Sequence, residues 1–135
     1  MFSLNDSNRY FLYPHPTDMR KSFYSLSGIV KNKMDKDIQD GDVFIFINRS
    51  LSSLKILHME YGGLVIYHMK LEKGCLHLPE FDMDEERTEL GMNWAELMLM
   101  VQGIDPKKVK RSPRWIAENK AQRNVQKQVK KSDNH

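Results

Sequence analysis

One short segment limits the possible folds of this chain more than any other: the run Val43-Phe44-Ile45-Phe46-Ile47. It contains only β-branched and aromatic residues, and it follows the turn signal Asp40-Gly41-Asp42. A strand that has no polar face must be covered on both sides. The sequence therefore predicts a central strand with packed layers on both faces of its sheet.

Further strand-like runs lie around this segment. The strand candidates are residues 9–13, 43–47, 54–60, 64–71 and 75–78. Tyr61-Gly62-Gly63 separates two of them and is a hairpin signal. Pro14 and Pro79 end the first and last candidates, because proline cannot donate to a ladder. We expect an antiparallel β-meander of about four or five strands.

Two helices are predicted from apolar residues that recur with a period of 3.6. The stripes are Met19, Phe23, Leu26 and Val30 in the first helix and Trp94, Leu97, Met98 and Val101 in the second. Thr17 or Asp18 can cap the first helix, which should run to about Met34. Asn93 can cap the second, which should end near Gly103. Helices and a meander together predict an α+β fold.

Charge is distributed unevenly along the 135 residues. Residues 106–135 hold ten Lys/Arg against two acids, and since the whole chain carries +3, the first 105 residues have a net charge of −5. The expected organisation is a single α+β domain over residues 1–106 and a basic, flexible tail over residues 107–135. Such asymmetry favours a polyanionic partner, DNA or RNA.

Several classes of protein are disfavoured by the sequence. No apolar run approaches the roughly 20 residues of a membrane span, and the N-terminus lacks the pattern of a signal peptide, so a cytoplasmic protein without a membrane partner is expected. Cys75 is the only cysteine, which excludes an intrachain disulfide.

No motif for catalysis is present: the chain has no Gly-x-Ser-x-Gly, no His-Glu-x-x-His and no phosphate-binding glycine loop. His58, His68 and His77 lie on successive candidate strands and could in principle bind zinc, but no acid is placed to assist. The six acids of residues 80–91 are typical of a hydrated loop. We expect no enzyme activity, metal, cofactor or small-molecule substrate.

The first predicted helix carries a basic surface. On a helical wheel Arg20, Tyr24 and Lys31 lie within about 40° of one another, with Lys21 to one side. Such a face can bind phosphates, and the same pattern also fits a helix face that is merely solvated. Asp18 fits a helix cap better than a functional acid.

Three segments of the chain, in this order, resemble the TnpB-type accessory proteins of the insertion-sequence 66 family. They are Thr17-Asp18-Met19-Arg20-Lys21-Ser22-Phe23, the stretch from Phe44 through Arg49 to Gly74, and Leu97 to Ile104. The resemblance implies a protein that is encoded within the element, is needed for efficient transposition and has no established chemistry of its own. We therefore expect an accessory protein that acts through contacts with the transposase of the same element, with DNA, or with both.

This chain departs from the family pattern in the loop after Asn48. It keeps Arg49, but Ser50, Leu51, Ser52 and Ser53 stand where further charged residues are common in the family. The predicted DNA contact therefore shifts toward the first helix and the tail. The candidate nucleic-acid-binding residues are Arg20, Lys21, Lys31, Arg49, Lys55, Lys107, Lys108, Lys110, Arg111 and Arg114. The alternative is a protein-interaction adaptor for the transposase that does not bind DNA.

Overall fold

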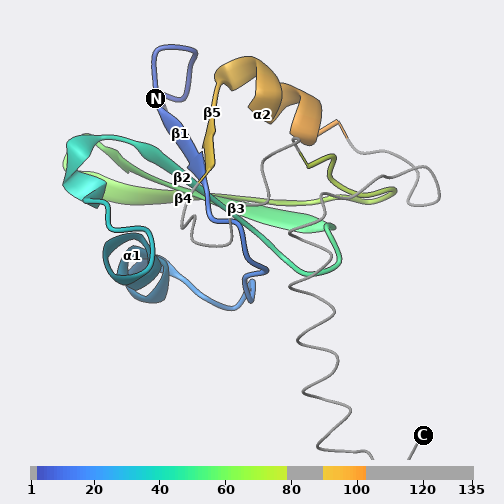
Figure 1. Cartoon of the computed structure of the whole chain (residues 1–135), viewed down its shortest axis with the longest axis horizontal. Coiled ribbons are helices and arrows are strands. Elements are labelled where there is room, and N and C mark those ends of the chain that lie inside the picture. Colours follow the sequence, from blue (N-terminus) through green and yellow to red (C-terminus); the bar gives the residue numbers. More distant parts are fainter. Residues whose placement is uncertain (1–2, 79–89, 103–135) are drawn as a thin grey trace, which may run out of the picture.

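The computed structural model of the chain describes residues 3–78 and 90–102. These residues form a five-stranded sheet with one helix on each face (Figure 1). In chain order the elements are β1 (Tyr10–Leu12), α1 (Phe23–Asn32), the short 3-10 helix η1 (Ile38–Asp40), β2 (Val43–Ile47), β3 (Ser53–Glu60), β4 (Gly63–Lys70), β5 (Leu90–Met92) and α2 (Trp94–Met100). The strand order is β4-β3-β2-β1-β5. The predicted α+β class is confirmed.

The central strand β2 is buried along its whole length, as its composition predicts. Its side chains alternate between two hydrophobic clusters. Val43, Ile45 and Ile47 pack on the α2 side of the sheet, whereas Phe44 and Phe46 pack on the α1 side. The sheet is therefore the middle layer of a three-layer arrangement with two separate cores.

The predicted hairpins around β2 are present. β2 pairs antiparallel with β3, and β3 pairs antiparallel with β4 over eight consecutive residue pairs, from Ser53↔Lys70 to Glu60↔Gly63. The turn between β3 and β4 consists of Tyr61 and Gly62, which both have positive φ (51° and 82°). This is the two-residue turn that fits the twist of a hairpin.

The first strand differs from the antiparallel expectation. β1 pairs parallel with β2, in the register Tyr10↔Val43 to Leu12↔Ile45. Parallel neighbours need a long crossover, and α1 provides it while covering one face of the sheet. The alternation of apolar residues locates a strand but does not determine its direction, so the sequence left this pairing open.

The other edge strand is also different from the one predicted. Residues 75–78 make only an isolated bridge at Cys75, and their backbone bonds elsewhere: the Leu76 N–H donates to the Leu51 carbonyl and the His77 N–H to the Met100 carbonyl. The edge strand is instead β5, which pairs antiparallel with β1. Its three residues are too few to give a visible alternation, so the sequence reading assigned Gly91 to a loop.

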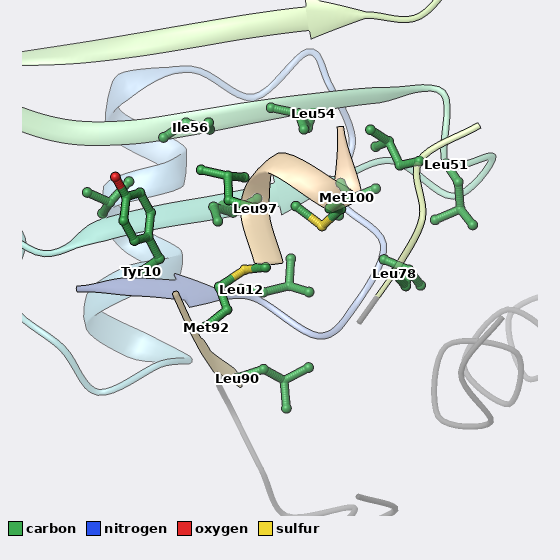
Figure 2. Packing of buried hydrophobic residues seen from close by; sticks show 14 of the residues in the cluster. Tyr10, Leu12, Leu51, Leu54, Ile56, Leu78, Leu90, Met92, Leu97 and Met100 are labelled. Atoms are coloured by element: carbon green, nitrogen blue, oxygen red, sulfur yellow. The ribbon is translucent and has the colours of Figure 1, made fainter. Parts of the chain in front are cut away.

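The second helix begins as predicted. The Asn93 side chain accepts from the Glu96 N–H at 2.8 Å, and the Glu96 carboxylate accepts from the Asn93 N–H at 2.9 Å. Leu97 and Met100 then enter the cluster above β1–β3 (Figure 2). Met98 is exposed, so its assignment to the apolar stripe was wrong. The helix ends at Met100 rather than near Gly103.

The first helix begins later than predicted, at Phe23 with Ser22 as its N-cap. The assignment of Thr17 or Asp18 as the cap was wrong. The Thr17 N–H donates to the Ile47 carbonyl at the end of β2, and the Asp18 side chain accepts from the Arg20 N–H in a local turn. Local side-chain bonds of this kind compete with helix formation. Arg20 and Lys21 therefore lie in a loop, and the helical wheel that joined Arg20 to Lys31 does not apply.

Candidate nucleic-acid interface

Three chain segments meet at one end of the sheet: the loop 17–22, the end of β2 and the turn 48–52. The Thr17 N–H bonds the Ile47 carbonyl at 2.8 Å, which holds the loop 17–22 beside the end of β2, and the turn 48–52 leads from this end into β3. We call this region the Arg20 end. Four of the basic candidates from the sequence lie here: Arg20, Lys21, Arg49 and Lys55.

Arg20 is oriented by Asp18 while staying accessible. Asp18 accepts from the backbone N–H of Arg20 at 2.8 Å, and its Oδ2 contacts the Arg20 Nη2 at 2.6 Å. These hydrogen bonds from Arg20 lower the pKa of Asp18 to about 2. The Arg20 side chain is 91% exposed. An exposed pair of this kind contributes little to stability, but it restricts the directions in which the guanidinium can point.

Lys55 holds the loop from beneath. Its residue is only 9% exposed, and its Nζ donates to the Lys21 carbonyl at 2.6 Å. A buried ammonium must be hydrogen-bonded to offset its loss of hydration, and this carbonyl supplies such a bond. The structure therefore places Lys55 as an anchor of the loop, whereas the side chains of Arg20 and Lys21 remain on the surface.

Arg49 lies in a tightly bonded turn. The Asn48 Oδ1 accepts from the N–H groups of Ser52 and Ser53 at 2.9 and 3.0 Å. Leu51 adopts a left-handed conformation (φ 61°), which is unfavourable by roughly 1 kcal/mol for a residue with a Cβ. Its side chain is fully buried in the α2-side cluster. The turn is thus fixed at both ends, and Arg49 is exposed on it.

The remaining candidates from the sequence do not join this group. Lys31 is exposed in the last turn of α1, about two helical turns from Tyr24, while the loop 17–22 precedes the first turn. Tyr24 is 94% exposed. The tail candidates lie outside the described residues; they are Lys107, Lys108, Lys110, Arg111 and Arg114.

Two basic residues of the Arg20 end were not predicted from the sequence: Lys70, which is exposed and pairs opposite Ser53, and Lys73. The Leu71 N–H donates to the Ser52 carbonyl at 2.8 Å, which brings the chain after β4 to this end of the sheet. Lys73 follows two residues later and is exposed. The hairpin turn at Tyr61-Gly62 could have indicated this position. The strand that follows the turn runs back along the strand before it, so its last residues lie at the end of the sheet where that strand begins.

The opposite end of the sheet holds paired charges, of which His58, Glu60 and Asp42 are buried; we call it the His58 end. His58 Nδ1 lies 3.0 Å from the Glu60 Oε2, and His58 Nε2 lies 3.1 Å from the Gly41 carbonyl oxygen. Both ring nitrogens face acceptors, so both are satisfied only when each carries a proton. The imidazolium form of His58 therefore fits this site and pairs with the Glu60 carboxylate.

Two further contacts complete the His58 end. The Tyr67 hydroxyl donates to the Glu60 Oε2 at 2.6 Å, and Arg9 binds Asp42 through two bonds of 2.8 and 3.0 Å. Burial favours a higher pKa for Glu60, but hydrogen bonds from Tyr67 and His58 outweigh it and leave the pKa below its usual value. Burial and the Glu60 carboxylate raise the pKa of Tyr67.

The three histidines that raised the possibility of zinc do not converge. His58 is buried on the α2 side, whereas His68 pairs opposite Lys55 and is exposed, and His77 lies beyond β4 and is also exposed. Within residues 3–78 and 90–102, no group of three or more His, Cys, Asp and Glu side chains is arranged to hold a metal ion. No helix of these residues is long and apolar enough to cross a membrane.

Comparison with known proteins identifies a family for this chain. The family model described as "IS66 Orf2 like protein" matches residues 8–111. Two uncharacterized proteins of Sinorhizobium fredii are similar. The protein y4jC is 27% identical over 78% of this chain and 86% of its own length, and y4hO is 30% identical over 66% of this chain and 74% of its own length. No solved structure matches.

Proposed function

The chain belongs to the IS66 Orf2-like family of insertion-sequence proteins, and from that premise we propose that it is a non-catalytic accessory protein of transposition. In this proposal it contacts the DNA of its element through the Arg20 end, with Arg20, Lys21 and Arg49 on phosphates and Lys55 as the anchor of the loop. The transposase of the same element is the proposed protein partner.

The observation that carries the proposal is the group of exposed cations on a rigid base. Arg20 and Lys21 are exposed on a loop that Lys55 and Ile47 hold in place, and Arg49 is exposed on a turn fixed by Asn48. Guanidinium groups bind phosphate oxygens through two bonds at once, so a preorganised pair of arginines suits a DNA backbone.

Local charge supports the same surface. Residues 17–34 contain four basic residues and a single acid, Asp18, although the first 105 residues together are net negative. The acidic remainder of the domain disfavours DNA contact elsewhere on it, because like charges repel. The tail, which is strongly basic in sequence, would add non-specific contacts that strengthen binding at low salt.

A salt titration of DNA binding tests the proposal. The full chain is titrated into a labelled duplex of about 30 base pairs while fluorescence anisotropy is measured, and affinity should fall roughly a hundredfold between about 50 and 200 mM salt. Replacing Arg20, Lys21 and Arg49 by Ala should reduce the magnitude of the log–log salt slope by about 3. Absence of binding at low ionic strength would contradict DNA contact.

A matched variant locates the surface. Replacing Lys31, Lys33 and Lys36 by Ala removes the same charge from the far end of α1 and from the segment after it. We expect a smaller change in the salt slope than for the Arg20-end variant. Equal changes would mean that binding follows net charge and not this surface. Replacing the five tail candidates, Lys107, Lys108, Lys110, Arg111 and Arg114, by Gln measures the contribution of the tail.

A second candidate function is a protein adaptor for the transposase that does not touch DNA. The observation that favours it is the exposed apolar side of α2, where Leu99 is 56% exposed and Met98 36% exposed. Exposed aliphatic side chains next to each other are typical of protein contacts. A complex with the transposase that is lost in Leu99→Asp, combined with no DNA binding by the isolated chain, would support the adaptor.

A further inference from the structure

The outer edge of β4 is the longest open strand edge that the structure describes. Among the residues that the structure describes, β4 is the terminal strand of the sheet, and all eight of its residues pair with β3 on one side only. The other terminal strand, β5, has three residues. An open edge presents a row of backbone N–H and C=O groups that can pair with another strand.

β4 lacks the features that usually block such an edge. Its sequence is Gly-Leu-Val-Ile-Tyr-His-Met-Lys, with no proline and with its single charged residue, Lys70, at the end. Its one-to-one register with β3 contains no bulge. Natural edge strands are commonly protected by prolines, bulges or a lysine in the middle of the strand. This edge is therefore open to pairing.

The side chains of β4 leave both hydrophobic clusters incomplete at this edge. Leu64 and Ile66 belong to the α1-side cluster, and Tyr67 and Met69 to the α2-side cluster, and all four are only half-buried. The neighbouring strand β3 is almost completely buried. A strand added beside β4 would extend both clusters at once.

We propose that the occupant of this edge is β4 of a second copy of the chain, paired antiparallel about a two-fold axis at Ile66. Such an axis stands perpendicular to the sheet and opposes residues that face the same side. It places Ile66 opposite the partner's Ile66 and Val65 opposite the partner's Tyr67. An aromatic residue opposite a β-branched one is a favourable cross-strand pair.

Charge placement favours the antiparallel copy over a parallel one. Lys70 stands at one end of β4, and Tyr61, which is 82% exposed, precedes the other end. Antiparallel pairing keeps the two lysines apart and brings Lys70 beside the partner's Tyr61, where an ammonium can lie over an aromatic ring. It also directs the two Arg20 ends in opposite directions along the joined sheet.

Cysteine cross-linking of the full chain tests the pairing. Ile66→Cys places two cysteines at the axis, with Cα atoms about 5 Å apart, which is within the range of a disulfide. His68→Cys is the control: this residue is the more exposed of the two, but its copies would be about 14 Å apart. The native Cys75 is buried. Under mild oxidation we expect a covalent dimer for Ile66→Cys only, and preferential cross-linking of His68→Cys would overturn the proposal.

Sedimentation equilibrium provides an independent readout. The full chain should show a monomer–dimer equilibrium, and a pure monomer at about 100 µM would overturn the proposal. Tyr61→Asn should weaken the dimer by about fivefold through loss of the ring, while its folding stability is kept or raised because Asn tolerates the left-handed conformation of this turn. An unchanged dimer affinity in Tyr61→Asn would show that Lys70 does not contact the partner's Tyr61 in the dimer.

Discussion

The two ends of the sheet use charge in opposite ways. At the His58 end the charged groups are paired: His58 and Glu60 are both buried and pair with each other, and the buried Asp42 pairs with Arg9, whose side chain is 70% exposed. At the Arg20 end Lys55 is buried beneath the loop, and the arginines above it are exposed. Paired buried charges contribute to the specificity of a fold, whereas exposed cations are available to a partner. The contrast separates a structural end from the end that we propose to contact DNA.

Substitution of Glu60 should have the largest effect on stability. Glu60→Gln removes the charge that compensates His58 inside the protein while keeping an acceptor for Tyr67. Breaking a buried pair on one side costs about 3 kcal/mol in free energy of unfolding, which urea denaturation will measure. A loss below about 1 kcal/mol would show that the His58 end does not hold a charged pair.

A double-mutant cycle sharpens this result. His58→Phe removes the imidazolium and is expected to destabilise the chain as well, because it leaves the Glu60 carboxylate without one of its partners. The double variant His58→Phe/Glu60→Gln should lose less free energy of unfolding than the two single variants lose together. We expect a difference of about 1 kcal/mol or more. Additive losses would mean that the two side chains act independently.

The pH dependence of stability should follow from Glu60. Its pKa is lower in the folded chain than its usual value, so the folded state favours the ionised form. This contribution is fully present above the usual glutamate pKa and is lost as pH falls through the lower pKa of Glu60 in the folded chain. The difference in free energy of unfolding between wild type and Glu60→Gln should therefore shrink on acidification. If this difference did not change with pH, the stability lost in Glu60→Gln would come from packing and not from the charge of Glu60.

Lys55→Met should affect DNA binding more than stability, unlike the substitutions at the His58 end. The substitution keeps the apolar stem and removes the ammonium that bonds the Lys21 carbonyl. Because that carbonyl belongs to an exposed residue and can bond water, the free energy of unfolding should change by less than about 1 kcal/mol. DNA affinity should fall by about threefold as the loop loses its anchor. A large loss of stability with unchanged DNA affinity would make Lys55 purely structural.

Asp18→Asn should produce the smallest change. Asp18 is ionised at neutral pH, since its pKa is about 2, and it competes with phosphate for Arg20. The variant should bind DNA about twofold more tightly in the anisotropy titration. Asp35→Asn removes the same charge beyond α1 and should leave affinity unchanged. A similar gain in both variants would reflect net charge alone.

Much of the fold was predictable from local patterns. The run Val43–Ile47 required burial on both faces, Tyr61-Gly62 fixed a hairpin, and Asn93 with Glu96 marked the start of α2. The start of α1 was not predictable in this way. Met19 continues the apolar period of the helix, yet the backbone at Thr17 bonds β2, a contact across thirty residues that no window of sequence contains.

The candidate site was predicted only in part. Arg20, Lys21 and Arg49 were identified by residue type, and they are exposed together at one end. Lys55 was identified for the same reason, but its burial depends on the register of β3 against β2 and on the loop above it. Lys70 and Lys73 were not predicted because their nearness to this end depends on the length of β4.

By itself, the sequence determined the α+β class, the central position of Val43–Ile47 and the excess of basic residues near the first helix and in the tail. Periodicity, turn residues and charge are local properties, so the chain displays them directly. The tertiary structure alone decided the parallel pairing of β1, the identity of the edge strands and the gathering of the cations at the Arg20 end. These depend on contacts between residues far apart in the chain, whose geometry is set by packing on a common sheet.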